Sequence, residues 1–363
     1  MKTTLIHGLN EKDMQAVVNA LTLNAFYYPS LFPLKFNPTL TWKAIQADYG
    51  IPIAADVVAY NSSAPKKTRQ VVSRLSGDIP KIEISRIKEE SDLNEYYQLL
   101  HYANTTEGSQ AILDWIYNDV EFCFTGVNAR LEWLALQALS LGEIALSKTN
   151  NAGIVTETAV DFLVPSGHKS GVAVTWTSGH SATGVPITNI RAIVKAAKTA
   201  GHPVKYMLMD QDTFDVMVLQ DSVIKFCASW VLSATSLAPT PTLAQVNAAL
   251  SSSKLPTIVI VDSCVAIELE DGTRTTVYPW QTGVVTFVPD LVVGNTYHAP
   301  LADELVATST ALKVKRGPVL IKRYSLEEPS IQEVTKGLAN AFPVWASAQQ
   351  SYLMYALDTS WSL

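Results

Sequence analysis

The sequence predicts an α+β fold built around one long helix. Polar residues recur at intervals of four and three residues from 114 to 132, so they form one narrow stripe on an otherwise apolar helix. Helical and strand-like patterns then alternate between 187 and 290. A strand-like apolar run returns at 319–324, near the end of the chain. Together these patterns favour helices and strands packed around a shared core.

The composition excludes several classes of protein. The 363 residues are 48% hydrophobic and only 17% charged, which suggests that a partner covers much of the surface. A formal net charge of −6 opposes a nucleic-acid binder held by its overall field. Three cysteines without a close pair indicate neither a disulfide framework nor a cysteine metal site. No uncharged apolar stretch reaches the ~18 residues that a membrane span requires.

Residues 1–47 lack the pattern of a compact domain. A short amphipathic stretch at 14–21 leads into an aromatic run whose two prolines, Pro29 and Pro33, oppose a helix. We therefore expect an extended arm whose large apolar side chains need a partner to cover them. Packing of the arm against its own core is the alternative. The residues expected to contact another subunit are Phe26, Tyr27, Tyr28, Leu31 and Phe32.

Residues 48–90 alternate short apolar runs with clusters of turn-forming residues. This pattern predicts a long two-stranded ribbon, with 51–55 going out and 79–84 coming back. A two-stranded ribbon is marginally stable alone in water, so it needs a surface to lie on.

Charge is segregated along this part of the chain. Residues 66–88 hold seven Lys and Arg against two Asp and Glu, whereas 89–121 hold eight Asp and Glu with no Lys or Arg. These segments could be two solvated faces, or complementary surfaces that meet between copies of the chain. Under the second interpretation the basic contact residues are Lys66, Lys67, Arg69 and Arg74, and the acidic residues of the long helix are Asp114, Asp119 and Glu121.

The long helix is expected to follow a cap signal at 105–109 and to end at Gly142. Residues 143–177 predict strands, of which Ala173–Trp176 is the clearest, and residues 291–312 predict a looser connection. Between them the pattern predicts helices at 187–197, 213–219 and 242–250, and strands at 204–209, 257–261, 265–270 and 284–287.

Motifs for catalysis are weak. The segment 179–184 departs from a hydrolase nucleophile elbow because Thr183 stands where the second glycine is required. The histidines are scattered without the spacing of metal ligands. Asp210 and Asp212 follow a predicted strand, as catalytic residues of an α/β enzyme do, but N-capping of the next helix is the preferred interpretation. We therefore expect no catalytic, cofactor-binding or metal-binding residues.

Four segments follow one another in an unusual order. They are the aromatic–proline run 28–33, the small apolar run 49–56, the apolar end of the long helix at 130–142, and the helix–strand segment 187–212. This order resembles that of the major capsid proteins of tailed bacteriophages, and of the lambda-like major capsid protein E family in particular. The resemblance extends over nearly the whole chain.

The resemblance implies the Hong Kong 97-like capsid fold. In that fold residues 1–47 would be the N-terminal arm and 48–90 the E-loop. Residues 91–185 would form the P-domain with its spine helix, 186–307 the A-domain, and 308–363 the P-domain return segment.

The resemblance also implies a structural protein without enzymatic activity. Copies of the chain would form hexamers and pentamers of an icosahedral virion shell, assembled in the host cytoplasm, that encloses double-stranded DNA without sequence-specific binding. No cofactor and no membrane would be involved, while decoration, scaffold and portal proteins would be candidate partners. Because the arm begins almost at once, we expect a separate scaffold or none. Two alternatives stay open: an α/β enzyme with a site in 186–290, and an encapsulin-type compartment shell.

Overall fold

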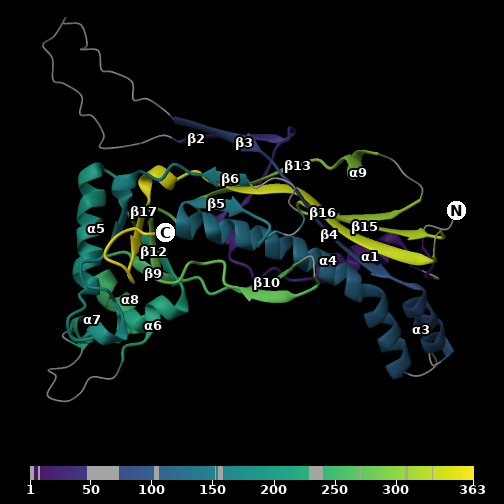
Figure 1. Ribbon diagram of the computed structural model, residues 1–363, viewed down its shortest axis with the longest axis horizontal. Coiled ribbons are helices and arrows are strands. Elements are labelled where there is room, and N and C mark those ends of the chain that lie inside the picture. The colour runs from purple at the N-terminus through teal and green to yellow at the C-terminus, as the bar shows by residue number, and fades with distance from the viewer. Residues whose placement is uncertain are drawn as a thin grey trace, which may run out of the picture.

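The computed structural model describes residues 4–6, 9–46, 73–101, 106–151, 153, 158–228, 240–269, 271–306, 310–328 and 330–363. The long helix α4 (Thr106–Leu141) runs through the molecule (Figure 1). A large sheet lies along this helix, and a second sheet with its helices forms one end. The α+β prediction is confirmed.

Helix α4 has 36 residues and ends, as predicted, at Gly142, whose φ of +80° suits glycine. Its apolar side chains are buried from several sides, as the wide apolar face requires. The polar stripe divides into two parts. Positions 114–125 of the stripe are exposed, whereas Asn128 and Glu132 are buried.

The large sheet, six-stranded within the described residues, is centred on β16 (Gln332–Trp345). One half of β16 lies between β4 (Lys81–Lys88) and β15 (Val319–Leu326), and its other half pairs with β13 (Gly294–Ala299). The outer strands are β14 (Leu312–Arg316) and β1 (Leu34–Phe36). At Gly337 a Cβ would stand 2.6 Å from the carbonyl oxygen of Cys123, so this glycine lets α4 pack directly on the sheet.

Two predictions for this sheet are wrong. The stretch assigned to a looser connection contains β13 and the short helix α9 (Ala302–Leu305). Strand β16 was not predicted at all. Nearly all its positions are buried, so the alternation of a half-exposed strand is missing, and Gly337 and Pro343 suggest breaks. Pro343 is tolerated because only β13 pairs with that part of the strand within the described residues.

The second sheet has the order β7-β17-β12-β8-β9 within the described residues. Most of the helices and strands predicted for 187–290 are confirmed, with shifts of a few residues at their ends. The strands are β7 (Lys169–Gly171), β17 (Tyr352–Tyr355), β12 (Val284–Val288), β8 (Tyr206–Met209) and β9 (Thr257–Ile260). The helices are α5 (Pro186–Ala200), α6 (Gln211–Val218), α7 (Asp221–Ala228) and α8 (Leu243–Ser252).

Residues outside 186–307 contribute to this sheet through β7 and β17. The strand predicted at Ala173–Trp176 does not form. Its chain is held instead by the buried Trp176 side chain and by the backbone N–H of Trp176, which donates to the carbonyl of Ala356. Tertiary packing of Trp176 therefore overrides the strand conformation that the alternating residues predict.

Shorter elements complete the fold. The remaining helices are α1 (Glu11–Ala20), α2 (Tyr28–Leu31) and α3 (Glu90–His101), with 3₁₀ turns at Ser166–His168, Ser178–His180 and Ala348–Gln350. The remaining strands form antiparallel pairs: β2 (Thr41–Gln46) with β3 (Ser73–Asp78), β5 (Glu143–Leu146) with β6 (Thr158–Asp161), and β10 (Val265–Glu268) with β11 (Arg274–Val277). Among the described residues, no helix combines the length and apolarity needed to cross a membrane.

The N-terminal segment differs from the expected extended arm. Pro29 lies in the first turn of α2, where a proline does not disrupt a helix. The side chains of Tyr28, Leu31 and Phe32 are buried in the chain's own core, and Phe26 and Tyr27 are half-buried against it. The alternative of packing on its own core therefore describes this segment, and among the five predicted contact residues only Phe26 and Tyr27 keep surface for a neighbour.

Candidate functional site

The polar residues near the end of α4 hold the N-terminal segment in place. The backbone N–H groups of Tyr27 and Tyr28 donate to the two carboxylate oxygens of Glu132, at 3.0 and 2.8 Å. The Tyr28 hydroxyl donates to Oδ1 of Asn128 at 2.6 Å. Burial raises the pKa of the Glu132 carboxyl, against the lowering effect of these N–H donors. Asn128 and Glu132 therefore bind the N-terminal segment of the same chain.

The base of a ribbon is formed by β2 and β3, which run along one long edge of the molecule (Figure 1). Trp42 is buried and stacks on Phe342 of β16 with ring centroids 6.0 Å apart. Opposite it, a Cβ on Gly77 would stand 2.9 Å from the Trp42 ring, so glycine makes room for the indole. These contacts fix the base of the ribbon on the large sheet.

The predicted strands of the ribbon need correction. The outgoing strand of the described ribbon is 41–46, inside the segment assigned to the arm, and the returning strand is 73–78. Ile82 and Ile84 instead belong to β4 in the large sheet, because β16 offers that strand an unpaired edge. The predicted strand 51–55 lies outside the described residues, as do Lys66, Lys67 and Arg69. Arg74 lies in β3, where it is the register partner of Ile45 in β2.

Part of the segregated charge is neutralised within one chain. Asp119 is buried and binds Lys88 Nζ at 2.9 Å and Arg86 Nε at 3.5 Å. Burial lowers the pKa of the Lys88 ammonium even beside this carboxylate. Asp119 therefore does not belong to an acidic surface, because β4 covers it. Asp114 and Glu121 are exposed, as expected.

A groove of about 1030 Å³ runs between β4, α4 and the β10–β11 hairpin. Apolar side chains from all three elements line it, among them Ile82, Phe122, Trp133 and Ile267. Carboxylates of Glu83, Glu121 and Glu268 also line it. The floor is tight, because a Cβ on Gly126 would stand 2.6 Å from Cδ1 of Ile84. Lys81, Arg130 and Arg274 line it as well, and Glu83 and Glu268 form ion pairs with Lys81 and Arg274. The groove thus offers an apolar surface whose charged side chains largely balance one another.

Sequence patterns revealed only half of the hairpin that forms one wall of this groove. A strand was predicted at 265–270, but its partner β11 was not. The signal was present in Asp271-Gly272, a dipeptide typical of hairpin turns, where Gly272 has a φ of +79°.

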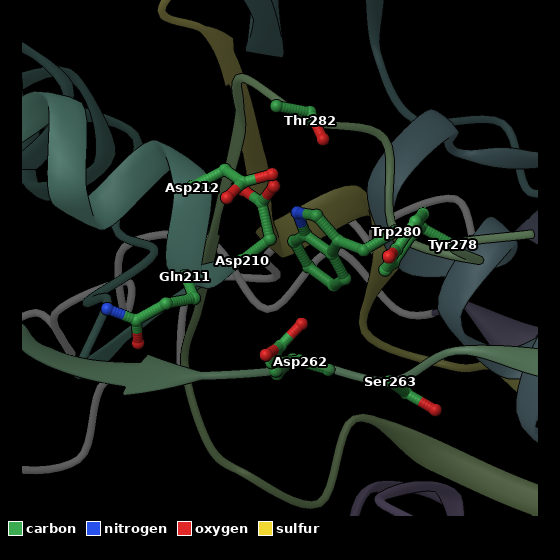
Figure 2. A pocket seen from close by; sticks show the side chains of 9 residues that line it. Asp210, Gln211, Asp212, Asp262, Ser263, Tyr278, Trp280 and Thr282 are labelled. Atoms are coloured by element: carbon green, nitrogen blue, oxygen red, sulfur yellow. The ribbon is translucent and has the colours of Figure 1, made fainter.

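The residues considered for catalysis lie in two places, at the start of α6 and in the loop around His180. Asp210, not Asp212, is the N-cap residue of α6, and its side chain makes no capping hydrogen bond. Both line a pocket of about 200 Å³ with Asp262 and Trp280 (Figure 2). His180 contacts the hydroxyls of Thr175 and Thr177 instead of a serine nucleophile. No three metal-binding side chains are grouped for an ion in the part of the chain that the structure describes.

A long helix on a broad sheet, with a second sheet at one end, leaves an apolar groove that suits contact with another chain. The family model of phage major capsid protein E matches residues 30–349, and the chain belongs to this family. No curated protein sequence matches it.

Solved structures show the same fold. A structure described as the capsid protein of a prophage of E. coli CFT073 is 13% identical, with a TM-score of 0.57 over 96% of this chain and 99% of that one. A phage-related protein from Bordetella bronchiseptica RB50 is 12% identical, with a TM-score of 0.51 over 95% of this chain and 97% of that one. The expected Hong Kong 97-like fold is confirmed.

Family membership defines the function at the level of the virion. The chain is a structural protein of a bacteriophage capsid shell. The two alternatives, an α/β enzyme and an encapsulin-type compartment, are not favoured. The family is one of structural capsid proteins.

Proposed function

We propose that copies of this chain form hexamers and pentamers of an icosahedral shell around double-stranded DNA, and that they assemble in the host cytoplasm. The contact proposed between copies is the β2–β3 ribbon of one subunit lying in the groove of a neighbour. The observation that carries this proposal is the groove between β4, α4 and the β10–β11 hairpin.

The apolar walls of the groove support this arrangement. Partly exposed apolar side chains in a groove of this size mark a surface for another chain. The ribbon has a firm base at Trp42, and a two-stranded ribbon gains stability when it packs on a second surface. The ribbon would therefore cover the apolar walls of the groove, and the groove would give the ribbon a second surface to pack on.

Charge supports the same pairing. Lys66, Lys67, Arg69 and Arg74 belong to the ribbon segment, and the exposed carboxylate of Glu121 lines the groove. The other two groove carboxylates, Glu83 and Glu268, already form ion pairs within their own chain. Because Arg86 and Lys88 are already paired with Asp119, the four basic residues of 66–74 are the ones proposed to meet the neighbour. Decoration, scaffold and portal proteins are proposed as further partners. The enclosed DNA needs no tight attachment to an acidic wall.

Reversing the ribbon charges tests the proposal. The variant with Lys66, Lys67, Arg69 and Arg74 replaced by Glu is expected to fold, by circular dichroism, but to lose closed shells in electron micrographs. Each exposed pair contributes only ~0.2–1 kcal/mol, but the contacts repeat at every subunit of a shell. Raised salt is also expected to weaken wild-type assembly.

A matched control carries the same change of charge elsewhere. Its four reversed residues are exposed and lie outside the ribbon and the groove: Lys12, Lys148, Lys225 and Lys254. This control is expected to assemble. Normal shells from the ribbon variant at low salt would contradict the electrostatic part of the proposal and leave apolar contacts to hold the ribbon.

A further inference from the structure

The pocket beside α6 has an unusual lining for a shell protein. It lies between the N-terminus of α6, the loop after β9 and the loop between β11 and β12 (Figure 2). Asp210 and Asp212 line it from the helix side, and Asp262 reaches it from the loop after β9. Trp280 forms another side. No Lys, Arg or His belongs to this lining among the described residues.

One oxygen of the buried Asp210 carboxylate lacks a donor, although Thr213 and Thr282 donate hydrogen bonds to the same carboxylate. The Asp210 side chain is only 7% exposed, and its Oδ1 has no hydrogen-bond partner among the described residues. A buried oxygen without a donor is costly, and burial raises the pKa of this carboxyl. Asp212 and Asp262 are exposed and add negative charge at the rim. A donor with positive charge would satisfy all three groups.

The lining indicates which kind of cation fits. Within the described residues, no three acidic side chains are placed as a metal ion would need. An ammonium or guanidinium group spreads its charge over several N–H donors and also binds well against aromatic rings. The indole of Trp280 is fixed in place, because its Nε1 donates to the carbonyl of Val284 at 3.0 Å. Tyr278 adds a second, exposed ring.

We propose that this pocket binds an organic cation through its ammonium or guanidinium group, held by Asp210, Asp212 and Asp262 beside Trp280. Two sources carry that chemistry. One is a basic side chain of a second copy of the chain, and helix α5 presents three exposed ones, spaced by four and three residues along one face: Arg191, Lys195 and Lys198. The other is a free diamine. The first source rests on the proposed assembly, whereas the pocket itself does not.

Agmatine, a small molecule with a guanidinium at one end and an ammonium at the other, is a suitable probe. Its binding to the unassembled full-length chain is measured by isothermal titration calorimetry. We expect saturable binding that weakens at least about tenfold when Asp212→Asn and Asp262→Asn are combined, because two charge-assisted hydrogen bonds are lost. Asp215→Asn is the matched control, since Asp215 is exposed on the same helix but does not line the pocket. It is expected to keep wild-type affinity.

Asp210→Asn provides a second variant, and circular dichroism shows whether each variant is folded. Absence of saturable binding, or equal affinity for wild type and the Asp212→Asn/Asp262→Asn variant, would overturn the proposal. Repeating the titration on assembled shells separates the two sources. If agmatine no longer binds to shells, but binds again to shells of the combined Arg191→Gln, Lys195→Gln and Lys198→Gln variant, the cation comes from a second copy of the chain. If agmatine still binds to wild-type shells, the pocket takes a free cation. If the chain forms no shells, the titration on the unassembled protein still decides whether the pocket binds cations.

Discussion

Replacing Glu333 with Ala is expected to lower the free energy of unfolding by about 3–5 kcal/mol, the usual cost of removing one partner from a buried ion pair. Glu333 of β16 and Arg323 of β15 are both 0% exposed, and Arg323 Nε donates to Glu333 Oε1 at 2.9 Å. The same carboxylate accepts from the Thr4 hydroxyl and the Leu5 N–H. The substitution would leave the guanidinium charge uncompensated and release the start of the chain.

Urea denaturation of the unassembled subunit measures this effect. The control replaces both partners by apolar residues of similar size, Arg323→Met with Glu333→Leu, which is expected to be far less destabilising because no charge stays unpaired. A Glu333→Ala subunit as stable as the wild type would show that the buried ion pair does not stabilise the fold. A double variant as unstable as the single one would show that the loss of stability does not come from the unpaired guanidinium charge.

Shortening the ribbon is expected to abolish shell assembly while the subunit stays folded. Gln46 and Ser73 face each other as partners in the register of β2 and β3. Residues 47–72 can therefore be replaced by Asn-Gly, which closes a two-residue hairpin between these positions. The base of the ribbon at Trp42 is kept together with Arg74, and the other three basic residues proposed to meet a neighbour, Lys66, Lys67 and Arg69, are removed.

Electron microscopy and size-exclusion chromatography measure the outcome. A second variant, in which a Gly/Ser segment of the original length replaces residues 47–72, separates the loss of specific ribbon contacts from the effect of length. Both variants are expected to melt close to the wild-type subunit and to form no closed shells. Normal shells from either variant would show that the ribbon is dispensable.

The sequence predicted the long helix and three strands of the second sheet, β8, β9 and β12, because their patterns are local. The spine helix has a repeating polar stripe and a glycine stop, and α5, β8 and α6 follow one another with clear changes of periodicity. Strand β16 was not predicted because both of its faces are buried, so polar and apolar residues do not alternate along it.

The candidate contact residues were harder to predict for a different reason. Charge counts along the chain showed two neighbouring segments of opposite charge. Only the packing of β4 on α4 shows that Asp119 forms ion pairs with Lys88 and Arg86 of its own chain. The aromatic run suggested that its side chains are exposed. Instead, Glu132 of α4, about a hundred residues away in sequence, accepts hydrogen bonds from the backbone N–H groups of Tyr27 and Tyr28 and holds them against the helix. Contacts between distant segments leave no mark in a local pattern.

A cryo-electron microscopy reconstruction of particles formed by the purified chain tests the central claim most directly. We predict closed icosahedral shells of hexamers and pentamers, in which the ribbon of each subunit extends from its base at Trp42 over the groove between β4, α4 and the β10–β11 hairpin of a neighbour. Particles in which this ribbon packs only on its own subunit, or a protein that stays monomeric at assembly concentrations, would contradict the account.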